Sequence, residues 1–232
     1  MRVILRVRGK GGTDRPDKHD IQAVLYNAFG DSEFGRAHDD DRFKYFTYSD
    51  YFCDTRGRGT VIVSSPHARL VDTVFDWFSG QTRIRLGKEY YEIEEIQKVR
   101  PRLSNTFISG SPIVLYRDST SGEYFSLDRH GDISFFLERL KDNAIKKYEF
   151  YSGKRISFDE PIFDEVEFRK EVAVPVRIRG SQVIFIGSVW KMLRREDMSG
   201  LEGFYSFLME TGLGEKNSLG FGFVNPVECS NR

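Results

Sequence analysis

Hydrophobic and polar residues alternate at the start of the chain. Over residues 2–8, Val3, Leu5 and Val7 fall on one side, and arginines, Arg6 among them, fall on the other. A period of two is typical of a strand that buries one face. We therefore expect a first strand with a cationic outer face.

Further patterns extend this element into a complete unit. Asp20 is a predicted N-cap for a helix whose apolar stripe is Ile21, Val24, Leu25 and Ala28. Strand-like segments at 43–52 and 60–64, a helical stretch at 67–78, and strands near 82–86 and 90–98 follow. The order β-α-β-β-α-β is that of the ferredoxin-like motif.

A second series of elements follows a predicted junction at 101–111. The patterns predict strands at 112–117, 123–127 and 162–168, a helix from Asp132, and a hairpin with arms at 172–179 and 182–187. The helix from Asp132 has an outer face that we expect to be solvated, formed by Glu138, Arg139, Lys141, Lys146 and Lys147. Lys191, Arg194 and Arg195 are expected on another helix, and the chain ends with a helix, a glycine-rich loop and a strand.

Composition narrows the class of protein. The 232 residues are 39% hydrophobic and 30% charged with a net charge of zero, and they contain no apolar run of the ~18 residues that a membrane span needs. No cleavable signal is recognisable, so we expect a cytoplasmic protein. Cys53 and Cys229 are too few for a disulfide framework, and neither has the neighbours of a zinc site. Because neither half is strongly basic, a nucleic-acid site would have to be a local patch.

The run 212–224 is the most informative segment. Its glycines and polar centre are Gly212, Gly214, Lys216, Asn217, Ser218, Gly220 and Gly222. Glycines let a backbone approach a ligand closely and direct N–H groups at an anion. A nucleotide-binding phosphate loop is disfavoured, because Phe221 follows Gly220 where a Lys-Ser/Thr pair is needed, and because the predicted order is helix, loop, strand.

With this loop, the chain resembles a known family. The loop resembles the C-terminal glycine-rich signature of the CRISPR-associated endoribonucleases that cut repeat RNA, the sixth Cas family within the RAMP superfamily. The segment 25–29 and the run from His38 to Ser49 resemble the active-site region of the archaeal members. The resemblance covers nearly the whole chain and implies an α+β fold of two tandem ferredoxin-like (RRM-like) domains, at 1–102 and 103–232.

The resemblance also implies a catalytic set of Tyr26, His38 and Lys44. Metal-free RNA cleavage needs a base for the ribose 2′-hydroxyl, an acid for the departing 5′-oxygen and a cation for the phosphorane-like charge. Each residue also has a simpler interpretation. Tyr26 lies about 150° from the centre of the apolar stripe of its helix, so it is not part of that face, but it could be an aromatic packed against a neighbouring element. His38 could belong to a surface turn, and Lys44 could be an ordinary lysine at a strand edge. The run 39–41 is expected to be a solvated turn, since its carboxylates lack calcium-loop spacing.

Other residues could bind RNA or have only local roles. Besides the loop, we expect Arg6, Arg177 and Arg179 to contact RNA phosphates, although each cluster could be a solvated face. The other histidines, His19, His67 and His130, are better explained by turn or cap structure.

The family's function is then the expectation for this chain. That function is metal-independent, cofactor-free cleavage of the precursor transcript once per repeat, with 2′,3′-cyclic phosphate and 5′-hydroxyl products and delivery of guide RNA to an interference complex. A homodimer is possible and membrane association is not expected. The main alternative is a non-cleaving repeat-RNA-binding homologue or structural subunit.

Overall fold

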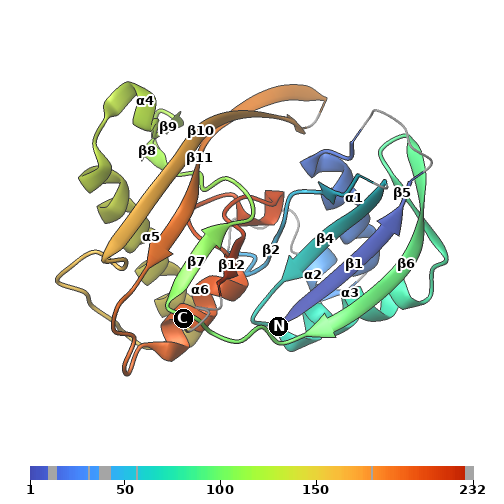
Figure 1. Cartoon of the computed structure of the whole chain (residues 1–232), viewed down its shortest axis with the longest axis horizontal. Coiled ribbons are helices and arrows are strands. Elements are labelled where there is room, and N and C mark those ends of the chain that lie inside the picture. The colour runs from blue at the N-terminus through green and yellow to red at the C-terminus, as the bar shows by residue number, and fades with distance from the viewer. Residues whose placement is uncertain (10–14, 31, 37–42, 56, 179, 228–232) are drawn as a thin grey trace.

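Among the described residues, two larger antiparallel sheets lie side by side with helices packed on them (Figure 1), and a separate sheet has only two strands. This computed structural model describes residues 1–9, 15–30, 32–36, 43–55, 57–178 and 180–227. The first sheet uses residues before 100 and the second uses residues after 105. This separation agrees with an α+β fold of ferredoxin-like units, whereas the domain boundary at residue 102 remains a prediction.

The first sheet has the strand order β2-β4-β1-β6-β5, with β3 paired to β4. Its strands are β1 (Arg2–Arg8), β2 (Thr47–Tyr48), β3 (Phe52–Cys53), β4 (Arg58–Ser64), β5 (Arg83–Leu86) and β6 (Glu89–Val99). The helices are α1 (Lys18–Phe29), the short α2 (Glu33–Arg36) and α3 (Ala68–Ser79). The central β1 pairs antiparallel with β4 and β6, as the ferredoxin-like motif requires.

The predicted periodicities define the first core. Val3, Leu5 and Val7 are buried under the apolar stripes of α1 and α3. The predicted N-cap was wrong by three residues: Asp17 caps α1 by accepting from the Asp20 amide, and the Asp20 side chain accepts from the Asp17 amide in return. The predicted strand at 43–52 is reduced to the two-residue strands β2 and β3.

The second sheet has the order β10-β11-β7-β12. Its strands are β7 (Thr106–Ser109), β10 (Glu165–Ile178), β11 (Ser181–Arg194) and β12 (Val224–Pro226), and β8 (Tyr116–Asp118) pairs with β9 (Glu123–Tyr124) separately. The helices are α4 (Leu127–His130), α5 (Ile133–Ser152), α6 (Glu202–Thr211) and the 3-10 turn η2 (Asn217–Leu219). This is a second ferredoxin-like unit with β8, β9 and α4 inserted.

Several predicted elements of this half were wrong. β7 lies inside the predicted junction, and the predicted strand at 162–168 is mostly the start of the long hairpin β10–β11. Lys191 and Arg194 were predicted on a helix but lie in β11. There they form ion pairs with Glu167 and Glu165 of β10. The final strand begins at Val224, so Phe221 and Phe223 belong to the loop before it.

The outer face of β1 is less cationic than its sequence predicts. Arg2 is only 3% exposed, and its guanidinium donates to Asn225 Oδ1 at 2.7 Å and to the Val224 carbonyl at 2.6 Å, so it joins the two sheets. Arg6 forms an ion pair with Glu95 at the surface. Within the described part of the chain, no helix is long and apolar enough to cross a membrane.

Candidate nucleic-acid interface

The glycine-rich loop presents only its centre to solvent. Residues 215–219 are half-buried, whereas 212–214 and 220–224 on either side are buried. At the centre Lys216 has φ +59°, a left-handed conformation that is uncommon for a residue with a side chain. Its ammonium lies 5.3 Å from the centre of the Tyr116 ring. A ligand therefore has access to the turn around Lys216 and not to the glycines at its flanks.

The structure gives the flanking glycines a different role from close approach to a ligand. A Cβ at Gly222 would lie 1.8 Å from the Leu213 carbonyl oxygen, and a Cβ at Gly220 would lie 2.3 Å from the Tyr48 ring. Both residues also have positive φ, at +71° and +79°. They are glycines because the loop packs tightly against the protein itself. RNA contacts at these positions remain a prediction.

Gly222→Ala is expected to lower the free energy of unfolding by about 4 kcal/mol or more, because the new methyl meets backbone that cannot move aside. Gly122→Ala is the matched control: its φ is +73°, but no atom lies within 4 Å of the added Cβ. That control should lose only the ~1–2 kcal/mol of a left-handed residue. Equilibrium urea unfolding followed by circular dichroism measures both losses. Equal losses would show that Leu213 moves aside and that packing of the loop does not require glycine.

Side chains from both halves of the molecule hold the carbonyl groups of the loop. Thr47 of β2 donates to the Phe221 carbonyl at 3.0 Å, and Gln22 of α1 donates to the Ser218 carbonyl at 3.1 Å. The side-chain amide of Asn217 donates to the Leu213 and Phe221 carbonyls, both at 3.0 Å. Asn217, a predicted RNA contact, therefore has its side-chain amide engaged within the loop.

Two buried lysines complete these contacts. Lys18 of α1 pairs with Asp50, donates to the Gly220 carbonyl at 2.6 Å and lies 4.6 Å from the centre of the Phe221 ring. Lys147 of α5 donates to the Gly212 and Gly214 carbonyls at 2.8 and 3.0 Å and to Asn217 Oδ1 at 2.9 Å. The expectation that Lys147 lies on a solvated face was wrong, because it is 3% exposed.

The spacing along α5 carries a signal that could have located Lys147. Phe136, Leu140 and Ala144 form the buried stripe of the helix, and residue 147 continues it with a step of three. A lysine on an apolar stripe must find acceptors for its ammonium, because a buried charge without them is costly. Here the carbonyls of the loop are those acceptors.

Burial lowers the pKa of Lys147 from its ordinary 10.5 to about 7, against the opposing effect of the Glu215 carboxylate. A lysine with a lower pKa in the folded state binds fewer protons there than in the unfolded chain between these pH values. Its contribution to stability is thus fully present above about pH 10.5 and is lost as the pH falls through about 7. We expect the wild type to gain stability relative to Lys147→Met between pH 7 and 10, measured by urea unfolding. Parallel pH profiles would contradict this.

A cavity of about 520 Å³ joins the loop to the segment that contains Lys44. It is lined by residues 43–46, by Ser119, by α5 and by the loop at 214–218. Its basic side chains outnumber its acidic ones: Lys44, Arg139, Lys146, Lys216 and the buried Lys147 against Asp142 and Glu215. Clustered positive charge in a concave site attracts a polyanion even when the net charge of the protein is zero.

The predicted catalytic residues are partly located by the structure. Lys44 is half-buried in the wall of this cavity. Tyr26 is half-buried on α1, and its ring centre lies 6.4 Å from that of Phe46, which lines the same cavity. The centre of its ring also lies 5.4 Å from that of Phe29, and the catalytic role of Tyr26 remains a prediction. His38 and the aspartates at 39–41 lie outside the described residues.

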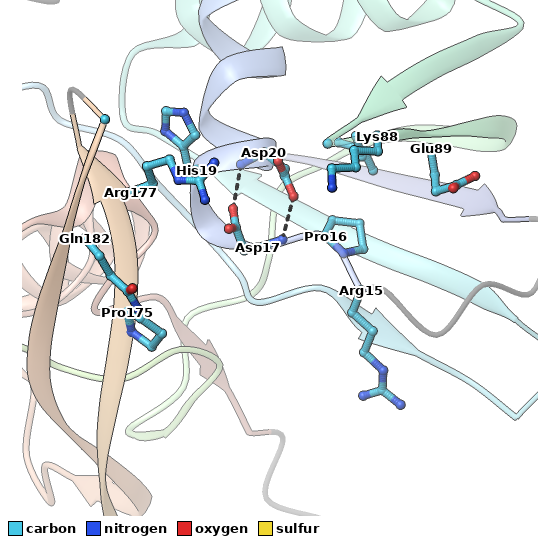
Figure 2. Close-up of a pocket in the computed structure, with 13 residues that line it drawn as sticks. Arg15, Pro16, Asp17, His19, Asp20, Lys88, Glu89, Pro175, Arg177 and Gln182 are labelled. Carbon is cyan, nitrogen blue, oxygen red and sulfur yellow. Dashed lines mark hydrogen bonds between the residues drawn. The ribbon is translucent and has the colours of Figure 1, made fainter.

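The hairpin arginine faces a different groove. Figure 2 shows Arg177 and Gln182 on the hairpin across from His19 and Asp17 at the start of α1. This groove has a volume of about 540 Å³ and mixed charge. Arg179 lies outside the described residues. The structure thus brings Lys44 and the glycine-rich loop to one cavity, and it places Arg177 in a second cavity and Arg6 on the outer face of the first sheet.

Comparison with known proteins gives a consistent result. Residues 95–226 match the family described as CRISPR associated protein Cas6, C-terminal. The chain is 36% identical over 226 residues to CRISPR-associated endoribonuclease Cas6 2 of Methanocaldococcus jannaschii, covering 93% of this chain and 94% of that protein. It is 27% identical to CRISPR-associated endoribonuclease Cas6 of Pyrococcus furiosus, covering 88% and 80%.

Solved structures have the same fold. One described as CRISPR associated protein Cas6 superimposes with a TM-score of 0.71 at 25% identity, covering 98% of this chain and 99% of the other. Another, described as an RAMP protein binding different RNA substrates, gives 0.73 at 17% identity, covering 98% and 100%.

Proposed function

Because the chain belongs to the Cas6 family of CRISPR-associated endoribonucleases, we propose that it binds the repeat in a CRISPR precursor transcript and cuts it once per repeat. The cut leaves a 2′,3′-cyclic phosphate and a 5′-hydroxyl, and no metal takes part. The product is the guide RNA of an interference complex.

One observation carries this proposal: the shared cavity. Lys44 and Lys216 are 172 positions apart in the sequence, yet both line the same cationic space. Each belongs to one of the two motifs through which the sequence resembles the family. A site in which an accessible turn of backbone and a cluster of lysines converge suits an RNA phosphate, because ammonium groups and amide N–H groups both stabilise an anion.

The chemistry we propose needs little beyond these residues. The ribose 2′-hydroxyl next to the cut loses its proton as it attacks the adjacent phosphorus, and the 5′-oxygen takes up a proton as its bond to phosphorus breaks. His38 transfers a proton, Lys44 stabilises the charge that develops on the phosphate oxygens, and Tyr26 supplies a hydroxyl as a further donor. The assignment of His38 rests on its position six residues before Lys44 in the matching motif.

The test is single-turnover cleavage of repeat RNA in EDTA. We expect one cut per repeat at the rate seen with magnesium, and no cut in a control RNA of scrambled sequence. A requirement for magnesium would exclude the metal-free mechanism. Tight, specific binding without a cut under either condition would favour the non-cleaving homologue instead.

A further inference from the structure

A third cavity, of about 650 Å³, lies beside the cavity that contains Lys44 and has aromatic walls. It is formed by α2, by residues 43–46 and by the start of α3. Five of its lining residues carry aromatic rings: Phe34, Phe43, Tyr45, Phe46 and His67. We call this cavity the aromatic pocket. Its volume is in the range of sites that hold small organic ligands, about 300–1,000 Å³, so a nucleobase fits.

One buried serine holds the backbone of two of these residues. The Ser65 hydroxyl donates to the Tyr45 carbonyl at 2.7 Å and accepts from the His67 amide at 3.1 Å. Ser65 is fully buried. Tyr45 has φ +42°, a conformation that costs a non-glycine residue energy and persists only when its surroundings impose it. The backbone is thus strained at the point where the Tyr45 ring forms a wall of the pocket.

The second half of the molecule supports the same wall. The Tyr151 ring of α5 lies 5.2 Å from the Tyr45 ring and 5.3 Å from the His67 ring, centre to centre. His67 is the N-cap residue of α3, but its side chain makes no capping hydrogen bond. Burial lowers its pKa, although Glu33 opposes the shift, so the imidazole is neutral at pH 7 and presents an uncharged aromatic face.

The aromatic pocket shares a wall with the proposed RNA site. Residues 43–46 line both cavities, so Lys44 lies between the aromatic rings on one side and the glycine-rich loop on the other. Arg69 adds a second cation to the lining of the aromatic pocket, together with one carboxylate, that of Glu33. A phosphate held at Lys44 therefore has its neighbouring nucleoside within reach of the rings.

We propose that the aromatic pocket holds one unpaired base of the bound RNA, the base of a nucleotide adjacent to the phosphate at Lys44. The proposal rests on the proposed function, since it takes RNA as the ligand. Unstacked bases in RNA complexes stack on Phe, Tyr and His side chains, and such stacking tolerates any base because every base has a π face. Holding this base outside the RNA stack orients the sugar and phosphate beside it for attack.

The experiment combines RNA lacking single bases with a protein lacking one ring. Repeat RNAs, each with one abasic nucleotide within three positions of the cut, are titrated against the wild type and against His67→Leu, and affinity is measured. In the wild type, one abasic position should weaken binding by about 5- to 150-fold, the range for one stacked base. In His67→Leu, an abasic nucleotide at the same position should weaken binding clearly less, since the base has already lost part of its stacking surface on the protein.

The control is Tyr90→Leu, which removes a 53% exposed ring on β6 away from both cavities and should leave the abasic profile unchanged. The proposal is overturned if an abasic nucleotide weakens binding to His67→Leu by the same factor as binding to the wild type at every position. It is also overturned if no abasic nucleotide weakens binding to the wild type by fivefold. The second of these criteria uses only the wild-type protein, so it holds even if His67→Leu does not fold. If the protein never cuts RNA but His67→Leu still reduces the effect of an abasic nucleotide, the proposed nuclease activity is wrong and the proposed base-binding role of the aromatic pocket is supported. A dimer that His67→Leu dissociates, without coupling to the RNA, would identify the pocket as a self-association surface and overturn the proposal.

Discussion

Replacing the 2′-hydroxyl at the cut site by hydrogen is expected to abolish cleavage completely. In the proposed mechanism the RNA supplies its own nucleophile, and a 2′-deoxyribose has no oxygen to attack the adjacent phosphorus. The measurement is single-turnover cleavage of a repeat RNA with one deoxynucleotide at the cut. Binding should stay within a few-fold of that of the unmodified RNA, because one hydroxyl contributes little to a contact dominated by phosphates.

The control is the same substitution one nucleotide to either side, which should leave the rate within a few-fold. A deoxy substrate that is still cut at the modified position would show that water is the nucleophile. The roles proposed for Tyr26, His38 and Lys44 would then have to be abandoned, because hydrolysis by water needs a different arrangement of base and leaving group.

His38→Ala is expected to lower the single-turnover rate by about 10²- to 10⁴-fold, which is the typical contribution of a positioned acid or base. Affinity for the repeat should remain within a few-fold, since this residue is proposed to move a proton and not to hold the RNA. The two effects are separated by measuring the rate at saturating protein and the dissociation constant independently.

His130→Ala is a suitable comparison. His130 accepts a hydrogen bond from the Ser126 amide at the start of α4, so this variant removes a histidine whose role is local structure. It should cleave at close to the wild-type rate. If His38→Ala also cleaves at that rate, His38 has no part in the reaction, and another group must transfer the proton.

Local patterns predicted the elements of the first half well, for a clear reason. In β1, α1 and α3, the residues that face the core recur with the period of the element, so burial can be inferred from neighbours alone. The N-cap was harder, because Asp17 and Asp20 are both good caps and their reciprocal hydrogen bonds involve both carboxylates. Only the direction of the backbone at the helix start distinguishes them.

Elements that depend on distant partners were missed. β7 is four residues long, and it is a strand because β11 and β12 pair with it from more than 80 positions away. Lys191 was placed on a helix because basic residues close in sequence suggest one face. Its actual partner is Glu167 across the hairpin, 24 positions earlier, and no local pattern contains that pairing.

The sequence by itself determined the family, the pair of α+β units and the two motifs, because these depend on residue types at fixed spacings. Only the tertiary structure decided what those residues contact. The flanking glycines pack against Leu213 and Tyr48, Lys147 is buried beneath the loop instead of solvated, and Lys44 lies between a cationic cavity and an aromatic pocket. Apart from the contact between Gly222 and Leu213, these contacts join groups that are tens of positions or more apart in the chain. They meet because the two sheets lie side by side, linked by hydrogen bonds from Arg2, Lys18 and Thr47 to carbonyls of the last segment. No single segment of the sequence has a signature of that arrangement.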